Sequence, residues 1–266
     1  MKKFPRQTII LTSLFLVTVL SSFVLLREDK RPVFYIIGDS TVKNGDGTGK
    51  GSLWGWGSFM ADYFDTSKIA VRNHAIGGRS SRTFITEGRW DKVLAELRKG
   101  DYVIMQFGHN DSGPLDDTAR ARGTIKGIGE ESKEVYNPIM KKQEVVYTYG
   151  YYMRKYIRDA KAKGATPIVC SPIPRNDWKE GKVGRSSESY AKWAKEVAEQ
   201  EGALFINLNE LVAAKYEEMG ADAVKPFFPG DHTHTNDAGA KLNAAIVVAE
   251  IKGLKGCDLK NFLRSH

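Results

Sequence analysis

The chain has 266 residues, of which 41% are hydrophobic and 27% are charged. These values exclude a disordered chain and a fibrous repeat, and the length suffices for one large domain with a substantial core. Two cysteines, Cys170 and Cys257, make no disulfide framework, and Cys170 is expected as a buried thiol. The formal net charge is +8. Because the basic residues are dispersed and no binding motif occurs, nucleic acid is excluded as an expected partner.

Residues 1–30 have the pattern of an export signal. Three basic residues precede a mostly apolar stretch over residues 8–26, namely Lys2, Lys3 and Arg6. The stretch is also long enough to span a bilayer, so an uncleaved N-terminal membrane anchor is the alternative. Both readings predict an exported protein, either periplasmic or extracellular. Without these three bases the formal charge falls from +8 to +5, and residues 31–266 are expected to form a single domain.

From residue 31 onward, short apolar runs alternate with amphipathic stretches. Five runs have the length and composition of buried strands: 33–37, 70–73, 102–107, 167–170 and 204–208. Apolar residues at helical spacing predict helices near 56–64, 90–97, 152–164, 190–202 and 242–249. Such alternation is typical of a parallel sheet with helices on both faces. We therefore predict an α/β fold with a flavodoxin-like, five-stranded parallel sheet.

The connection from residue 108 to about residue 150 is long for a compact domain. Connections of this length are uncommon unless they serve a function. In its second half, Tyr136, Asn137 and Pro138 lie between two β-prone stretches, which predicts a hairpin. We therefore expect this segment to be functional.

Four short motifs carry polar residues that suit one reaction. They are Gly38–Thr41, Gly77–Ser80, Gly108–Asp111 and Asp231–His234. The first three follow the first, second and third predicted strands. Since the carboxyl ends of parallel strands lie at one edge of a sheet, and ligands bind at that edge, we expect these motifs to meet there. No single motif is specific, so the inference depends on their order and placement.

Ser40 is the candidate nucleophile, and it needs a neighbouring base to accept its proton. A turn or capping serine is the structural alternative. Among the five histidines, His234 is favoured as the base, because Asp231 three residues earlier can reach its Nδ1 and leave Nε2 free. The side chain of His232 is expected to leave in another direction, since it is adjacent to Asp231. Thr235 is expected to cap the helix that follows.

Acyl transfer also needs hydrogen-bond donors directed at the developing oxyanion. Gly78 can present its N–H closely because it lacks a Cβ atom. Asn110 can donate from its side-chain amide, and the backbone N–H of Ser40 is the third candidate. The alternatives are an ordinary turn at Gly77 and Gly78 and a loop-stabilising role for Asn110.

Candidates for substrate binding flank these motifs. Trp54 is a possible sugar platform, with core packing as the equal alternative, whereas Trp56 belongs to a helical core stripe. Arg79 and Arg82 lie beside Gly78 in the sequence and can bind a carboxylate through two parallel hydrogen bonds. A structural or solvated ion pair is the equal alternative for both arginines.

The four motifs resemble those of the SGNH, or GDSL, hydrolase superfamily, and in detail those of the rhamnogalacturonan acetylesterases. The residues that match the four naming the superfamily are Ser40, Gly78, Asn110 and His234. The resemblance implies a three-layer α/β/α catalytic domain, no metal and no cofactor. It implies a serine esterase that removes O-acetyl groups from plant cell-wall polysaccharide, with rhamnogalacturonan first and xylan next. The protein is expected to be a monomer. One departure is the glycine-rich stretch 44–51, where the superfamily usually has a leucine-like run.

Three other functions use the same residues. An O-acetyltransferase passes the acetyl group to a sugar hydroxyl instead of water. A dinuclear-metal phosphoesterase draws on the Gly-His-Asn-Asp motif at 108–111 and the histidines at 232 and 234. Such enzymes, however, begin with an Asp-x-His pair, and none precedes Asp39. A carbohydrate-binding module with a degenerate site is the third, and the intact nucleophile and base argue against it.

Overall fold

The computed structural model describes residues 31–264. The predicted export signal or anchor over residues 1–30 lies outside this range. Within it, no helix combines the length and the apolar character needed to cross a membrane.

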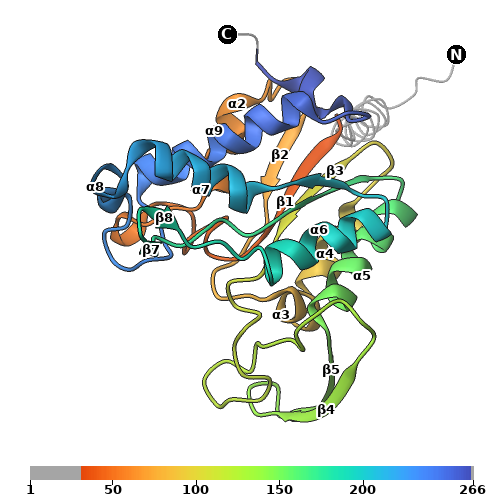
Figure 1. The fold of residues 1–266 in the computed structure, drawn as a ribbon. Coiled ribbons are helices and arrows are strands. Elements are labelled where there is room, and N and C mark those ends of the chain that lie inside the picture. The colour runs from red at the N-terminus through yellow and green to blue at the C-terminus, as the bar shows by residue number, and fades with distance from the viewer. Residues whose placement is uncertain (1–30, 265–266) are drawn as a thin grey trace, which may run out of the picture. The chain divides into compact units, whose positions relative to one another are not determined.

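The centre of the domain is the predicted five-stranded sheet (Figure 1). Its strands, in spatial order, are β2 (Ala70–Asn73), β1 (Val33–Gly38), β3 (Tyr102–Gln106), β6 (Thr166–Cys170) and β9 (Leu204–Ile206). Every neighbouring pair is parallel. All six side chains of β1 are buried, as expected of a strand covered on both faces. The prediction of an α/β fold with this sheet is confirmed.

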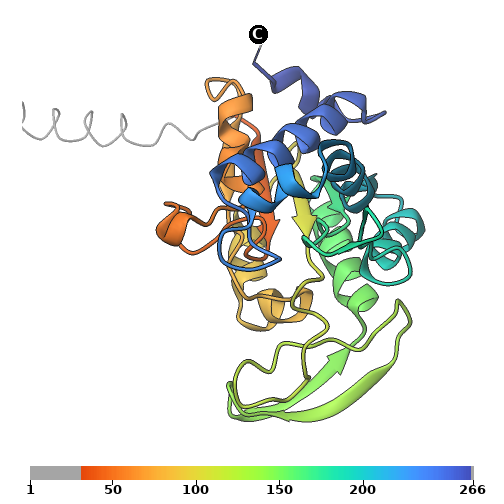
Figure 2. The same cartoon turned by 60° about the vertical axis from the view of Figure 1, so that its left-hand side comes forward.

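Helices cover both faces of the sheet, so the domain has three layers (Figures 1 and 2). Alternate residues of β1 divide between two apolar clusters, with Phe34 and Ile36 in one and Tyr35 and Ile37 in the other. The first cluster includes side chains of α2 (Met60–Tyr63), α7 (Leu208–Met219), α8 (Ala221–Val224) and α9 (Asp237–Gly253). The second includes side chains of α3 (Ser81–Thr86), α4 (Arg89–Glu96), α5 (Tyr149–Ala162) and α6 (Tyr190–Gln200).

Four short 3₁₀ helices are also present in the described residues, and all but the first contribute side chains to the first cluster. They are η1 (Lys50–Ser52), η2 (Trp56–Phe59), η3 (Lys225–Phe227) and η4 (Asp258–Phe262). Trp56 is fully buried in the core, as expected, and its indole N–H donates to Gln106. Cys170 and Cys257 are both buried and free, so the expectation of a core thiol at Cys170 is confirmed.

Three helices were not predicted: α3, α7 and the four-residue α8. The helix α3 begins at a capping box in which Ser80 and Thr83 satisfy each other's backbone N–H groups. The helix α7 begins two residues after β9, where the predicted strand 204–208 ran too far. The helix α3 follows a polar segment and α7 follows a strand almost directly, so the helical spacing of their apolar residues was not recognised in the sequence.

The long connection after β3 contains the predicted hairpin. It is formed by β4 (Ser132–Asn137) and β5 (Lys142–Tyr147), which pair antiparallel. Figure 2 shows this hairpin below the sheet, at the end of the domain where β1 and β3 finish. A second, smaller hairpin of β7 (Trp178–Lys179) and β8 (Lys182–Val183) follows β6.

Candidate active site

The carboxyl ends of β1 and β3 bring the first motifs together. Gly38 ends β1, and a Cβ atom on it would lie 2.6 Å from the carbonyl oxygen of Gln106 on β3. Only glycine therefore allows the two strands to finish so close together. Ser40 follows two residues later, in the turn where Val42 N–H donates to the carbonyl of Asp39 at 3.1 Å.

Ser40, His234 and Asp231 form a continuous hydrogen-bonded chain. The Oγ of Ser40 lies 2.8 Å from Nε2 of His234, and Nδ1 of His234 lies 2.7 Å from Oδ2 of Asp231. The carboxylate can only accept, so Nδ1 carries the proton and Nε2 is left to accept the hydroxyl hydrogen of Ser40. This is the geometry that a serine nucleophile and its base require.

The Asp231 carboxylate is held in its ionised form. Partial burial raises its pKa, but hydrogen bonds from the His234 ring and from the backbone N–H groups of His234 and Thr233 outweigh burial and lower the pKa to about 2. The two backbone bonds to Oδ1 measure 2.8 and 2.6 Å. The same contacts fix the direction of the carboxylate toward the ring.

The loop that carries the histidine is attached to the segment between η1 and η2. The backbone N–H of Trp54 donates to the carbonyl of Thr235 at 2.8 Å, and the hydroxyl of Thr235 donates to the carbonyl of Trp54. The expected capping role of Thr235 is wrong, because the cap of α9 is Asn236, whose side chain accepts from Gly239 N–H. Thr235 instead joins the histidine loop to Trp54 through its carbonyl and its hydroxyl.

His232 points away from Ser40, as expected. Its Nδ1 lies 2.7 Å from Oδ1 of Asp177, and its side chain is 50% exposed. Its backbone carbonyl accepts from Asn176 N–H. His232 thus connects two loops and has no contact with the nucleophile.

The three candidate oxyanion donors face the same cavity. Gly78 has φ +76°, in the left-handed region that favours glycine. Within residues 31–264, the N–H groups of Ser40 and Gly78 have no hydrogen-bond acceptor. Asn110 is 7% exposed and uses one amide hydrogen on the carbonyl of Arg79 at 3.0 Å. Its second amide hydrogen remains available to a ligand.

Buried polar side chains form a hydrogen-bonded network next to the nucleophile. Asp39 accepts from the N–H and the hydroxyl of Thr41, and its Oδ2 lies 3.3 Å from Nδ1 of His109. Burial raises the pKa of Asp39, but the nearby His109 and these hydrogen bonds lower it below its ordinary value. Asp111 accepts from Ser81. Asp39 and Asp111 therefore stabilise the segments around Ser40 and Ser81, through side-chain as well as backbone partners.

For Arg82, the prediction of a substrate ligand is wrong, and its equal alternative, a structural ion pair, is confirmed. Its side chain is 0% exposed and forms a two-bond ion pair with Glu144 of β5, at 2.8 and 2.7 Å. The prediction failed because Arg82 lies inside α3 and points under the long loop, whereas Gly78 precedes the helix. Arg82 is therefore an anchor for the hairpin.

The predictions of Arg79 and Trp54 as substrate-binding residues have different outcomes. Arg79 lines the cavity at Ser40, but its guanidinium is paired with Glu87 at 2.9 Å and donates to the carbonyl of Gly77. The indole of Trp54 packs against Phe59, with ring centroids 5.1 Å apart, and lies outside the cavity lining. For Trp54, these contacts favour the core-packing alternative.

Comparison with known proteins decides the family. The sequence profile of the GDSL-like lipase/acylhydrolase family matches residues 36–242, a span that contains Ser40, Gly78, Asn110 and His234. The chain belongs to the GDSL-like lipase/acylhydrolase family. As a member of this family, it is a carboxylic ester hydrolase.

Two relatives of this family member cover most of its length. It is 34% identical to a rhamnogalacturonan acetylesterase of Emericella nidulans over 226 residues, which is 85% of this chain and 86% of the relative. It is 33% identical to the probable rhamnogalacturonan acetylesterase YesY of Bacillus subtilis, over 83% of this chain and 92% of that protein.

Two solved structures have the same fold. The structure of YxiM from Bacillus subtilis is 29% identical with a TM-score of 0.67, and the match covers 84% of this chain and 57% of that one. Axe2, an acetylxylan esterase from Geobacillus stearothermophilus, is 20% identical with a TM-score of 0.57, covering 88% and 97%. At 20% identity the second match shows the fold alone.

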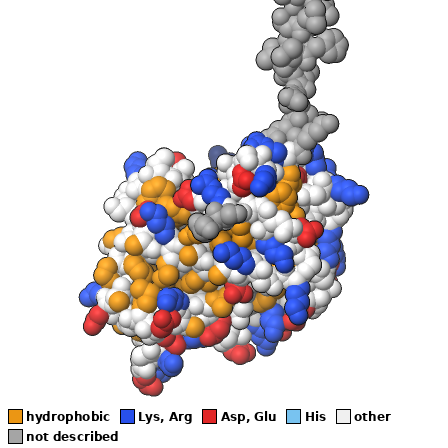
Figure 3. Space-filling model, turned by 90° about the horizontal axis from the view of Figure 1, so that it is seen from above, with side chains coloured by type: hydrophobic (Ala, Val, Ile, Leu, Met, Phe, Trp, Pro, Cys, Tyr) orange, Lys and Arg blue, Asp and Glu red, His pale blue; other side chains and the backbone are white. Residues whose placement is uncertain are grey.

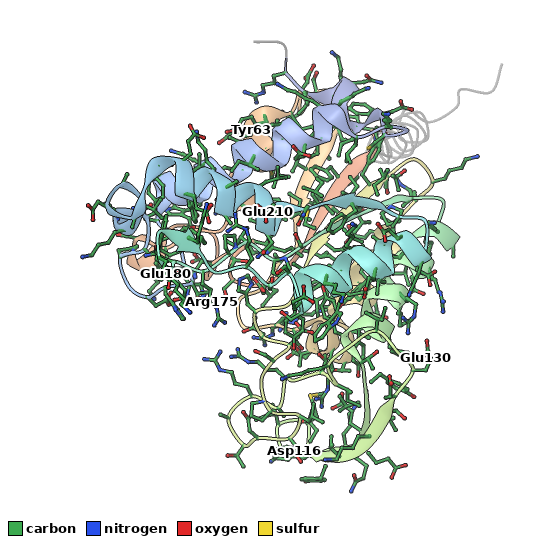
Figure 4. The ribbon with its side chains drawn as sticks, in the orientation of Figure 1. Tyr63, Asp116, Glu130, Arg175, Glu180 and Glu210 are labelled. Carbon is green, nitrogen blue, oxygen red and sulfur yellow. The ribbon has the colours of Figure 1, made fainter. Side chains whose placement is uncertain are left out.

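The GDSL motifs line a cavity of about 610 Å³ that includes Ser40, Gly78, Asn110 and His234. Sequence analysis missed three of its basic residues: Arg120 and Arg122 in the long loop, and Arg175 after β6. A smaller cavity of about 310 Å³ shares His109 and Arg175 with it. Figure 4 shows Arg175 on the side of the β7–β8 hairpin and Asp116 on the loop opposite.

Within residues 31–264, no three His, Cys, Asp or Glu side chains group as metal ligands.

Proposed function

We propose that the chain is a serine esterase that removes O-acetyl groups from plant cell-wall polysaccharide, with rhamnogalacturonan as the first choice and xylan as the next. The observation that carries this proposal is the chain from Ser40 Oγ through His234 to Asp231, with distances of 2.8 and 2.7 Å. The substrate is supported by the names of the two relatives that cover most of the chain. Because these relatives are acetylesterases, the phosphoesterase alternative is not favoured.

In the first half of the reaction, Ser40 Oγ attacks the acetyl carbonyl carbon while His234 Nε2 takes the hydroxyl proton. The tetrahedral intermediate collapses, and His234 returns the proton to the departing sugar oxygen. The products are a free sugar hydroxyl and acetyl-Ser40. Asp231 keeps Nδ1 protonated and stabilises the charged ring throughout.

In the second half, a water molecule gives a proton to His234 and adds to the acetyl carbonyl. Collapse of the second intermediate breaks the bond to Ser40 Oγ, which recovers its proton, and acetate leaves. Both intermediates carry an oxyanion, and the N–H groups of Ser40, Gly78 and Asn110 are its donors. Each such donor is worth about 3 to 4 kcal/mol in comparable sites.

Two substitutions test the mechanism. Ser40→Ala should abolish hydrolysis of p-nitrophenyl acetate, whereas Ser187→Ala, an exposed serine outside the cavity, should leave it unchanged. Retained turnover by Ser40→Ala would overturn the assignment of the nucleophile. Acetate release from acetylated pectin and acetylated xylan then ranks the two substrates. If an unacetylated acceptor gains acetyl groups and little free acetate forms, the enzyme is instead a transferase.

We also propose that the protein is exported and acts as a monomer, either free in the periplasm or outside the cell or held by an N-terminal anchor. The pattern over residues 1–30 and a polysaccharide substrate support export. Mass spectrometry of the mature protein tests it: loss of the N-terminal segment supports a cleaved signal, and an intact segment in a membrane fraction supports the anchor. Gel filtration of residues 31–266 tests the monomer.

A further inference from the structure

The loop between β3 and β4 places two arginines beside the oxyanion glycine. A Cβ atom built on Gly78 would lie 3.5 Å from Nη1 of Arg120 and 3.7 Å from Nη1 of Arg122. Nη1 of Arg122 also donates to the carbonyl of Gly78 at 3.4 Å. Both guanidinium groups therefore stand at the wall of the cavity where the acetyl ester must bind.

Neither guanidinium has a carboxylate partner in the part of the chain that the structure describes. The nearest acid in sequence, Asp117, uses one oxygen to accept from the backbone N–H groups of Arg120 and Ala121, at 2.6 and 2.5 Å. Burial and the neighbouring charge of Arg120 lower the pKa of Arg122. The carboxylates of Asp117, Asp39 and Asp111 act on the pKa of Arg122 in the opposite direction, but none of them forms an ion pair with it within residues 31–264. Two like charges side by side without an ion-pair partner form a site that an anion stabilises.

The other charged side chains that line the cavity do not neutralise Arg120 and Arg122. Arg175 lines it from the opposite side and has no ion-pair partner within residues 31–264. Glu87 is its acidic residue, and that carboxylate is already shared by Arg79 and Arg89 at 2.9 and 2.7 Å. On the face shown in Figure 3, by contrast, basic and acidic side chains are interspersed.

The loop is held in place before any ligand arrives. Its neck is closed by Gly123 N–H, which donates to the carbonyl of Pro114 at 2.8 Å. Nη1 of the buried Arg82 donates to the carbonyls of Leu115 and Gly123 at 2.8 and 2.9 Å. Arg120 and Arg122 lie between these points, so less conformational freedom is lost when they bind a ligand.

We propose that Arg120 and Arg122 bind the carboxylate of a uronic-acid residue of the substrate and thereby select acidic over neutral acetylated polysaccharide. This rests on the proposed function, and it names the residues that recognise the polymer. Since Gly78 borders the acetyl carbonyl, the carboxylate belongs to the acetylated sugar or to the next sugar along the chain. Guanidinium groups suit this task, because each can form two parallel hydrogen bonds with a carboxylate.

The first experiment measures selectivity as the ratio of kcat/KM for an acetylated galacturonate-containing oligosaccharide to kcat/KM for an acetylated xylo-oligosaccharide. Arg120→Gln and Arg122→Gln should each lower this ratio by about 10-fold to 100-fold, the usual effect of losing one charge-assisted pair, mainly through KM. Lys126→Gln, which removes an exposed charge outside the cavity, is the matched control and should not change it. A ratio within twofold of the parent in both arginine variants would overturn the proposal.

A second experiment separates this proposal from the proposed function. Unacetylated trigalacturonate should inhibit hydrolysis of p-nitrophenyl acetate competitively, more weakly as salt is added, and galactotriose should not. Equal inhibition by both sugars, or undiminished inhibition of the Arg120→Gln/Arg122→Gln variant, would overturn the role of the arginines. Absence of p-nitrophenyl acetate hydrolysis would instead contradict the esterase assignment. Calorimetric titration with trigalacturonate then still decides whether the arginines bind a uronate.

Discussion

Replacing Glu144 by alanine should destabilise the domain markedly, because it leaves Arg82 with an unpaired buried charge. Arg82 is 0% exposed and Glu144 is 8% exposed, and two hydrogen bonds of 2.8 and 2.7 Å join them. Asn137 donates to the same carboxylate at 2.7 Å and would lose its acceptor as well. Breaking such a buried pair costs about 3 to 5 kcal/mol. Since Nη1 of Arg82 retains two carbonyl acceptors, we expect about 3 kcal/mol.

Urea unfolding followed by tryptophan fluorescence measures this effect. With a slope of about 3 kcal/mol per molar urea, the midpoint should fall by about 1 M. Glu134→Ala, an exposed acid on the same hairpin, is the matched control and should change the free energy of unfolding by less than about 0.5 kcal/mol. The double variant Arg82→Met/Glu144→Met should be more stable than Glu144→Ala, because it leaves no charge unpaired. A loss below about 1 kcal/mol in Glu144→Ala would refute this reasoning.

Three further predictions concern the site. His234→Ala should lower kcat for p-nitrophenyl acetate by about 1000-fold or more, and His232→Ala by less than about threefold; the reverse order would transfer the role of base to His232. Asn110→Ala should lower kcat by about 100-fold to 1000-fold with little change in KM, and a change confined to KM would exclude an oxyanion role. Burial raises the pKa of Asp111 to about 7, against opposing hydrogen bonds from Ser81. The folded state therefore holds this proton more tightly than the unfolded state, and the associated stability is lost as the pH rises from about 4 to about 7. Urea unfolding over that range should show Asp111→Asn gaining stability relative to the parent as the pH rises, and a constant difference would contradict the shift.

The strands and the nucleophile, base and amide positions could be predicted because each depends on local sequence. An apolar run such as 33–37 can hardly be anything but a buried strand, and its carboxyl end then locates Ser40. The pairing of His234 with Asp231 followed from a spacing of three residues, a contact within one loop.

The arginines could not be assigned in this way. Arg79 and Arg82 are three positions apart, yet one lines the cavity and the other is buried, because α3 begins between them at its Ser80 cap. What each guanidinium meets depends on where the 108–148 segment folds, and that is set by the buried pair with Glu144, 62 positions away. Arg120 and Arg122 carry no motif at all, and their position follows only from the closed neck of their loop.

The sequence separation of 194 positions between Ser40 and His234 has a consequence for biogenesis. The nucleophile and the three oxyanion donors are encoded before residue 111, whereas the base and its partner Asp231 lie in the loop before α9, which packs against η2. A nascent chain that lacks its last 35 or so residues therefore holds the hydroxyl and the oxyanion donors without a base. Esterase activity should appear only after α9 has been synthesised and has packed onto the domain, so activity itself reports the docking of this helix.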